Sequence, residues 1–358
     1  MHFIATILTN LQKWINLAFL TTHRLPLVNK IVYNLEVKLN RSQVLSWGKF
    51  LIGWPLSVMS IAFIVKLILE KSNEASINLD QINWIYLIIG VLFFFIYYMF
   101  RSFLWQQTLK EKGCKINFKD NTYAFAFSEL KRYVPGNIWS FLSRGVQFQN
   151  LGVDKKTIGI SILADIQLVI IGCVVVSLLA IPWIINSRQE LQTELAGIIP
   201  LSVFAILIFF ISTAVIYTRR YGRSNSNGIV LHSAILLSNF LLPGFEVKSK
   251  IKLSILSVIT YFSFGVGNYF AFLSIFNNNF QDFLILSSFF VFSLLVGYLS
   301  FITPMGLGVR EGVVTLGFSK ITNTTNAGVI AIFTRIVLIL SELLFLLFAF
   351  LWKKFSRN

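Results

Sequence analysis

Residues 327–352 read AGVIAIFTRIVLILSELLFLLFAFLW, a long and almost unbroken apolar run. A helix needs about 20 predominantly apolar residues to cross the hydrocarbon core of a bilayer, and this run is long enough. Arg335 and Glu342 lie inside the run, about two helical turns apart, so both occupy nearly the same side of a helix. The run therefore predicts a membrane-spanning helix that carries ionisable groups.

Comparable apolar runs recur along the chain. They occupy residues 50–69, 84–103, 158–185, 199–217, 253–276 and 283–302, while the run at 229–245 is borderline because it contains His232, Asn239 and Pro243. Hydrophobic residues make up 56% of the 358 residues and charged residues only 13%, whereas soluble domains carry about 25% charged residues. The sequence therefore predicts an all-α integral membrane protein with seven or eight transmembrane helices.

The positive charge lies in the segments outside these runs. Lys and Arg clearly outnumber Asp and Glu in segments 1–49, 104–156 and 219–252, and such segments mark the cytoplasmic side. We predict a cytoplasmic lead at 1–49 with an amphipathic helix around Trp14, a polytopic domain at 50–352 and a basic tail at 353–358. The expected location is the cell (plasma or inner) membrane, with the N-terminus in the cytoplasm. Contact with anionic lipid explains the net charge of +16, so we exclude nucleic acid as a partner.

Two segments at membrane-like positions are too polar and too broken to be ordinary spans. Residues 128–144 read SELKRYVPGNIWSFLSR, and residues 303–312 read TPMGLGVREG. Pro135-Gly136 interrupts any helix in the first, and glycines free the backbone of the second, after which a short helix is expected to resume at 313–318. Short Gly/Pro-interrupted segments in corresponding places of two halves indicate a transporter site. We predict two re-entrant hairpins; an interfacial helix and a Gly-rich loop are the alternatives.

The spacing of the two breaks suggests an internal repeat. Pro135 and Pro304 are separated by nearly half the chain, and an inverted repeat would place one hairpin on each face of the membrane. Eight crossings satisfy this condition and put the basic tail inside, but they place Lys248, Lys250 and Lys252 outside. Seven crossings put the tail outside. We favour eight crossings, with the inverted repeat as a hypothesis.

Both broken segments resemble signature motifs of one family. Residues 131–139, KRYVPGNIW, with Arg144 shortly after, and residues 304–312, PMGLGVREG, are similar to the two motifs of the lysylphosphatidylglycerol synthase transmembrane-region family. The resemblance covers about residues 45–352. In the full-length synthases such a region is associated with moving aminoacylated phospholipid between leaflets, so the resemblance implies a flippase-like, lipid-handling membrane module. The chain ends at Asn358, so we expect the aminoacyl-transferase domain of the full-length synthases to be absent.

The candidate substrate-binding residues are those suited to an anionic head group. Arginine makes paired, charge-assisted hydrogen bonds with phosphate and stays charged, glycine-rich turns offer backbone N–H groups, and carboxylates balance the arginines when no ligand is bound. The predicted set is Arg132, Pro135, Gly136, Asn137, Arg144, Asp165, Pro304, Gly306, Gly308, Arg310, Glu311 and Arg335, with Glu342 as a further balancing carboxylate. Fixed salt bridges are the alternative for the carboxylates, and surface contact with lipid is the alternative for Arg132 and Arg144.

These features predict a lipid translocase, or a lipid-binding transporter module, acting on an anionic phospholipid or a polyprenyl-phosphate-linked sugar. The alternatives are an integral-membrane glycosyl- or acyl-transferase for a lipid carrier, an accessory subunit of such an enzyme, and a small-solute transporter. The sequence contains no recognisable catalytic set, metal-ligand spacing or nucleotide loop, so we expect no cofactor and favour a non-enzyme. Membrane lipid is the expected partner, and a separate lipid-modifying synthase or glycosyltransferase is a candidate one.

Overall fold

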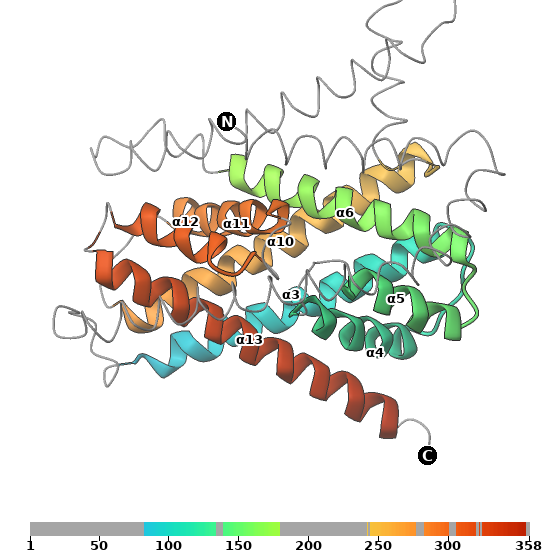
Figure 1. Ribbon diagram of the computed structural model, residues 1–358, viewed down its shortest axis with the longest axis horizontal. Coiled ribbons are helices and arrows are strands. Elements are labelled where there is room, and N and C mark those ends of the chain that lie inside the picture. The colour runs from blue at the N-terminus through green and yellow to red at the C-terminus, as the bar shows by residue number, and fades with distance from the viewer. Residues whose placement is uncertain are drawn as a thin grey trace, which may run out of the picture. The chain divides into compact units, whose positions relative to one another are not determined.

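The computed structural model describes residues 82–133, 139–179, 242, 244–276, 283–300, 306–319, 322 and 324–355, all within one compact unit, Pro55–Asn358. Every regular element in these ranges is a helix (Figure 1). The elements are α3 (Trp84–Lys110), α4 (Phe118–Glu129), the 3-10 helix η3 (Leu130–Tyr133), α5 (Trp139–Asn150), α6 (Lys155–Leu178), α10 (Val247–Ile275), α11 (Phe283–Leu299), α12 (Val309–Phe318) and α13 (Thr324–Phe355). The predicted lead at 1–49, the runs at 50–69 and 199–217, and most of the run at 229–245 lie outside the described residues.

Four of the described helices, α3, α6, α10 and α13, are long and apolar enough to cross a membrane, and α11 is a shorter apolar helix. This confirms the all-helical membrane architecture. The limits of the helices differ from the apolar runs, because caps and buried side chains extend them. Helix α3 continues to Lys110 because Leu104, Trp105 and Leu109 are buried. Helix α6 begins at Lys155 because the Asp154 side chain accepts a hydrogen bond from the Thr157 N–H and caps the helix.

The four long helices run in two directions. Helices α3 and α10 are antiparallel, since the Asn83 N–H donates to the Ser274 carbonyl at the start of α3 (2.8 Å) and Lys252 donates to Gln107 near its end (2.9 Å). Helices α6 and α10 are parallel neighbours, joined by the Ser257 hydroxyl and the Leu168 carbonyl (2.5 Å). Helix α13 runs in the direction of α3 (Figure 1). The basic C-terminal ends of α3 and α13 therefore lie at the same end of the helix bundle as the N-terminal ends of α6 and α10.

Glycines allow the helices around α10 to approach closely. A Cβ atom on Gly267 of α10 would lie 2.8 Å from the Phe94 ring of α3, and one on Gly172 of α6 would lie 2.4 Å from the Ser257 hydroxyl. Small residues at such positions let helix backbones pack closely in a membrane, where apolar burial against lipid gives little driving force. The close α3–α10–α6 packing fixes the positions of the polar groups that these helices carry.

The shorter helices form two pairs against this frame. Helix α4 lies side by side with α5, and η3 continues α4 (Figure 1). Helices α11 and α12 are antiparallel, because Gly297 of α11 faces Arg310 of α12 and the Phe289 ring faces Phe318. Helix α12 begins at Val309, earlier than the expected 313–318, because the Glu311 carboxylate accepts the Gly308 N–H (2.7 Å) and caps the helix.

Candidate functional site

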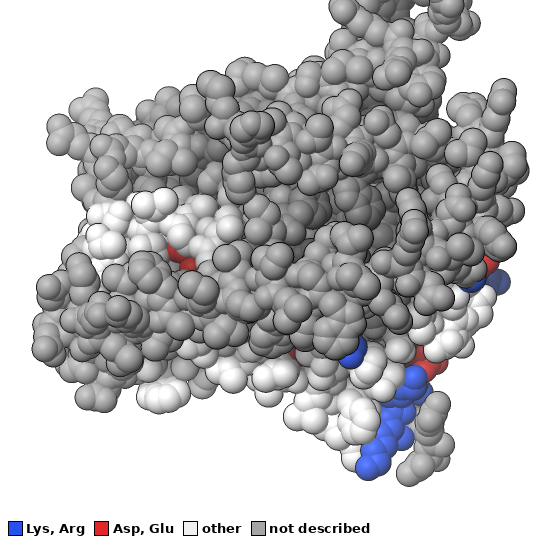
Figure 2. All heavy atoms as spheres, viewed as in Figure 1, with Lys and Arg blue, Asp and Glu red and all other residues white. Residues whose placement is uncertain are grey.

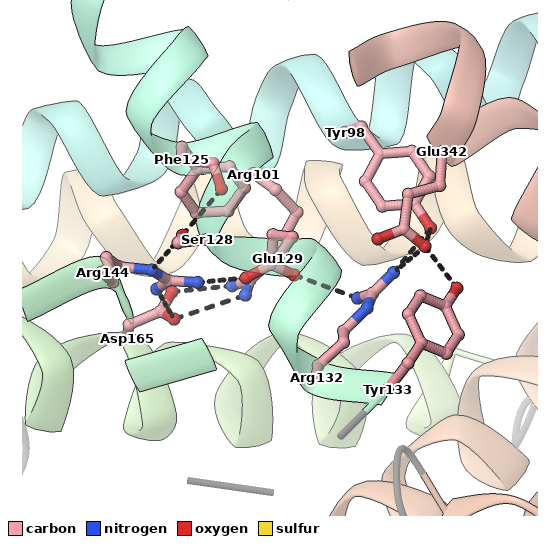
Figure 3. A network of polar contacts seen from close by, with 10 residues as sticks. All are labelled: Tyr98, Arg101, Phe125, Ser128, Glu129, Arg132, Tyr133, Arg144, Asp165 and Glu342. Carbon is pink, nitrogen blue, oxygen red and sulfur yellow. Dashed lines mark hydrogen bonds and ion pairs between the residues drawn. The ribbon is translucent and has the colours of Figure 1, made fainter. Parts of the chain in front are cut away.

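Six charged side chains from six elements form one network in the middle of the helices (Figure 3). We call this the central network; its members are Arg101 of α3, Glu129 of α4, Arg132 of η3, Arg144 of α5, Asp165 of α6 and Glu342 of α13. Arginines and carboxylates alternate along it, so each inner member contacts two opposite charges. Such alternation is the condition under which buried charges are tolerated.

Asp165 lies next to Arg101, which ends the central network on one side, and it binds two arginines. Arg101 donates hydrogen bonds from Nη1 to Oδ1 (2.7 Å) and from Nη2 to Oδ2 (3.3 Å). Arg144 Nη1 donates a third hydrogen bond to Oδ2 (2.8 Å). The Arg144 guanidinium also contacts the faces of Trp105 and Phe125, with ring centroids 4.7 and 4.5 Å away. Arg144 is buried among protein groups, so surface contact with lipid does not describe its setting.

Glu129 connects Arg144 to Arg132. One of its oxygens accepts a hydrogen bond from Arg144, and the other accepts one from Arg132 Nη1 (3.0 Å). Because Glu129 is the last residue of α4 and Arg144 belongs to α5, this carboxylate holds the end of α4 against α5. The pairing of α4 with α5 therefore depends on charge as well as on apolar packing.

Glu342 lies at the other end of the network. Its Oε2 accepts hydrogen bonds from Arg132 Nη2 (2.6 Å), the Tyr133 hydroxyl (2.5 Å) and the Tyr98 hydroxyl (3.2 Å). Its Oε1 is buried and has no hydrogen-bond partner among the described residues. Arg132 is the most exposed member here, with 15% of its side chain accessible, so this end is the least sealed.

A second group surrounds the start of α12, and we call it the α12 cluster: Asn268, Arg310, Glu311 and Arg335. Gly306 and Gly308 have φ angles of 65° and 82°, in the left-handed region that glycine adopts without strain. The α12 N-terminus that follows already binds a carboxylate, because Glu311 accepts the Gly308 N–H. The same carboxylate lies 3.3 Å from Arg335 Nη1 of α13, so Glu311 both caps α12 and balances Arg335.

Arg310 is the unbalanced member of the α12 cluster. Its Nη2 donates to the Asn268 Oδ1 (3.0 Å), and its guanidinium lies 5.0 Å from the centroid of the Phe264 ring. Its Nη1 is buried without a hydrogen-bond partner, and no carboxylate of the described residues lies within 4.0 Å of the guanidinium. Only 2% of Arg310 is exposed. A buried guanidinium with an unpartnered N–H has the chemistry to bind an anion.

A family model described as the lysylphosphatidylglycerol synthase TM region matches residues 47–345. The chain belongs to this family. No curated protein and no solved structure matches the chain. Family membership supports a membrane lipid-related function in a multi-pass membrane protein.

The structure groups the predicted site residues of this family chain in two places. Arg132, Arg144 and Asp165 lie in the central network, whereas Gly306, Gly308, Arg310, Glu311 and Arg335 lie at or beside the start of α12. Pro135, Gly136, Asn137 and Pro304 lie outside the described residues. Each of the three carboxylates singled out in the sequence has an arginine partner: Asp165 pairs with Arg101 and Arg144, Glu311 with Arg335, and Glu342 with Arg132.

Sequence reasoning missed four residues that complete these groups: Tyr98, Arg101, Glu129 and Asn268. A signal was available for Arg101, since it lies two residues before the end of the run at 84–103 and a charged residue inside a span indicates a functional or paired group. Glu129 lies within the first broken segment, 128–144, two residues before the motif begins. Neither Tyr98 nor Asn268 has a comparable signal, because polar residues are common in such helices.

Proposed function

We propose that this chain holds the phosphate of a membrane lipid at Arg310 and moves that lipid between the two leaflets. The observation that carries the proposal is the unbalanced charge of Arg310, which is buried, has a free Nη1 and has no carboxylate partner among the described residues. Leaving a charge buried and uncompensated costs several kcal/mol. A lipid phosphate at Nη1 would compensate it through a charge-assisted hydrogen bond.

The position of the Arg310 guanidinium along α10 favours a lipid over a soluble anion as its ligand. Arg310 contacts Asn268 and Phe264 of α10 (Val247–Ile275), a helix long and apolar enough to cross a membrane, at positions at least seven residues inside its C-terminal end. A soluble anion would lose its hydration shell at this depth, whereas a lipid can place its head group there and leave its acyl chains in the bilayer. The membrane lipid-related function of the family agrees with this choice.

We infer that both broken segments are re-entrant hairpins that enter from opposite faces. Helix α4 begins beside the C-terminal end of α13, where the Phe118 and Trp352 rings lie 5.8 Å apart, and reaches Glu342 through Arg132. Helix α11 begins beside the C-terminal part of α10, where the Tyr269 and Phe283 rings lie 4.9 Å apart, and its end lies near Arg310, since a Cβ atom on Gly297 would lie 3.1 Å from the Arg310 Cβ. Two hairpins meeting a central charged region is the arrangement of an inverted-repeat transporter.

The distribution of lysines supports the orientation in this proposal. Basic side chains gather near the C-terminal end of α13 (Figure 2), where Lys353 contacts Asp120 at 3.7 Å. Lys112 and Lys252 lie at the same end, on the loop after α3 and on the first turns of α10. Lysines mark the cytoplasmic side, so α4 and α5 would enter from the cytoplasm and the basic tail would lie inside. We also propose that residues 50–352 form a polytopic domain in the cell membrane and that the N-terminus of the chain lies in the cytoplasm.

A liposome translocation assay tests the proposed function. Purified protein is reconstituted with a fluorescent phosphatidylglycerol, phosphatidylcholine or polyprenyl phosphate, and movement to the outer leaflet is followed by dithionite quenching. We expect movement of an anionic probe, a fall of at least about tenfold for Arg310→Ala, and an unchanged rate for Lys354→Ala, which removes an exposed charge. A full rate for Arg310→Ala contradicts the proposal. No movement of any probe by folded protein would favour the transferase or accessory-subunit alternative.

A further inference from the structure

Glu342 differs from the other two carboxylates of the central network in how its oxygens are used. Both oxygens of Asp165 and both oxygens of Glu129 accept hydrogen bonds from guanidinium groups. Glu342 uses only Oε2, which accepts three hydrogen bonds, while its buried Oε1 has no partner among the described residues. A proton can therefore bind at Oε1 without displacing a donor that is already in place.

The donors around Glu342 Oε2 suit a neutral acid as well as a carboxylate (Figure 3). The hydroxyls of Tyr98 and Tyr133 are neutral, and they can still donate to Oε2 when a proton occupies Oε1. The contact with Arg132 at 2.6 Å depends on the negative charge, because charge-assisted hydrogen bonds are about twice as strong as neutral ones. Protonation of Glu342 therefore weakens one contact selectively, the one with Arg132.

Arg132 keeps other partners when Glu342 becomes neutral. Its Nη1 donates to Glu129 (3.0 Å), and its Nη2 also donates to the Tyr98 hydroxyl (2.8 Å). Asp165 offers a contrast, because it is the only carboxylate of the described residues within 4.0 Å of Arg101. A proton on Asp165 would leave Arg101 buried and uncompensated, which is strongly unfavourable. Both comparisons single out Glu342 as the carboxylate of the network that tolerates a proton.

The Glu342 end of the central network is also the accessible end. The Arg132 side chain is 15% exposed, whereas the side chains of Arg144 and Asp165 are each 1% exposed. Tyr133 is half-buried, and its hydroxyl lies 2.5 Å from Glu342 Oε2. Arg132 and Tyr133 thus connect Glu342 to the surface of the described helices, where a proton can arrive.

We propose that Glu342 is a proton-binding site and that proton binding there releases η3 from α13. A hydronium ion gives its proton to Oε1 and leaves as water, and Glu342 becomes a neutral carboxylic acid. Arg132 then stays with Glu129 and moves with the end of α4. The inference concerns a proton and does not depend on what Arg310 binds or on whether a lipid moves.

Ionisable groups from the surrounding helices set the direction of this switch. They are Tyr97 and Tyr98 of α3, Glu129 of α4, Arg132 and Tyr133 of η3, Arg310 and Glu311 of α12, and Arg335 of α13 itself. Tyr261 of α10 faces Tyr97, with ring centroids 5.9 Å apart.

Arg335 has its own carboxylate, Glu311 of α12, at 3.3 Å. Loss of the Glu342 charge therefore weakens the contact of α13 with η3 and leaves its contact with α12 in place. Acid pH favours a released η3, and alkaline pH favours a bound one, because only the ionised Glu342 forms an ion pair with Arg132.

Infrared difference spectroscopy tests the proton site directly. Spectra of the full-length protein in nanodiscs are compared between about pH 8 and about pH 5, on either side of the range in which a buried carboxylate can take up a proton. We expect the wild type to gain the C=O stretch of a buried carboxylic acid at the lower pH. Glu342→Gln should lack this band. Glu246→Gln, the same substitution at an exposed position before α10, should keep it.

Hydrogen–deuterium exchange at constant pH tests the release of η3. Glu342→Gln carries a neutral side chain and stands in for the protonated state. We expect the backbone amides of residues 128–133 to exchange about tenfold faster in this variant than in the wild type, which corresponds to about 1.4 kcal/mol. The amides of residues 155–160 at the start of α6, and all of these amides in Glu246→Gln, should exchange at the wild-type rate.

The outcomes decide the inference separately from the proposed function. A wild-type spectrum without the acid band, or a band that persists in Glu342→Gln, overturns the proton site. Unchanged exchange in residues 128–133 overturns the release of η3. If Glu342→Gln does not fold, Glu342→Asp decides, because it keeps an acid and should shift the band, and an unshifted band overturns the inference. The Arg310→Ala translocation assay decides the lipid site independently of these results.

Discussion

Arg144 of α5 and Asp165 of α6 form an ion pair of 2.8 Å between two side chains that are each only 1% exposed. Arg101 of α3 binds the same carboxylate at 2.7 Å, so Asp165 joins three helices. Replacing Asp165 by Asn would leave two arginines buried beside a neutral group. Breaking a buried pair in this way costs about 3–5 kcal/mol, and we expect Asp165→Asn to lower the unfolding free energy by that amount.

Thermal unfolding in detergent measures this effect, and Asp154→Asn is the matched control. Asp154 caps the same helix through a hydrogen bond from the Thr157 N–H, and asparagine caps as well as aspartate. The same substitution at this position should therefore leave the melting temperature nearly unchanged. Equal melting temperatures for the two variants would mean that the Asp165 pair contributes little to the fold.

The hydroxyl of Tyr133 is expected to stabilise the end of α4 through Glu342. It donates to Glu342 Oε2 at 2.5 Å, and hydrogen bonds to charged groups contribute about 1.5–3 kcal/mol. Tyr133→Phe should lower the unfolding free energy by roughly that amount, while Tyr98→Phe, whose bond is longer at 3.2 Å, should have a smaller effect. In Arg132→Gln, which removes the shared cation, the effect of Tyr133→Phe should change, since coupled neighbours are not additive. Strict additivity would show that the two groups act independently.

Gly306 and Gly312 offer a matched test of the turn before α12. A Cβ atom on Gly306 would lie 2.5 Å from the Gly297 backbone, and its φ angle of 65° disfavours other residues. Gly312, inside α12, has no atom within 4 Å of such a Cβ. We expect Gly306→Ala to displace Arg310 and reduce lipid binding, and Gly312→Ala to stabilise the helix by about 0.5–1 kcal/mol. Similar lipid binding by the two variants would contradict the role of the turn.

The sequence predicted the membrane class and the two motif segments because hydropathy and Gly/Pro breaks are local signals. It also predicted that Asp165, Glu311 and Glu342 pair with arginines, either as balancing carboxylates or in fixed salt bridges, and each lies in an ion pair in the structure. It could not supply the pairings themselves. Asp165 has no basic residue within one helical turn in sequence, yet two arginines reach it from other helices.

The contrast between Arg310 and the other arginines was also invisible in the sequence. Arg310 is followed directly by Glu311, which suggests a local pair, but Glu311 turns back to cap α12 and contacts Arg335 instead. The neutral partner of Arg310 is Asn268, which comes from α10. Which arginine keeps a free donor depends on how three helices cross, and no local pattern encodes that.

Labelling of Cys114 shows on which side of the membrane the loop after α3 lies, and the rate of this labelling depends on pH. Burial, together with the Asp154 carboxylate, raises the pKa of the Cys114 thiol above its usual value. Since the thiolate is the reactive form, labelling by a membrane-impermeant maleimide should be slow at pH 7 and should rise with pH up to that raised pKa. The proposed orientation predicts labelling in inside-out vesicles and protection in right-side-out vesicles.

Cys114→Ser is the control for this experiment, because the chain has only one other cysteine, Cys173, and it is buried. The variant should show no labelling in either type of vesicle. Labelling of the wild type in right-side-out vesicles alone would reverse the proposed orientation, and with it the face from which α4 and α5 enter.

An experimental structure in nanodiscs that contain phosphatidylglycerol tests the central claim most directly. The account predicts density for a lipid phosphate within about 3 Å of Arg310 Nη1, on the side away from Asn268, with the acyl chains leaving the seat towards the bilayer. The same map of Arg310→Ala should lack that density. An Nη1 that instead binds a carboxylate or carbonyl of the protein, with no lipid beside it, would show that Arg310 is a structural residue and would contradict the account.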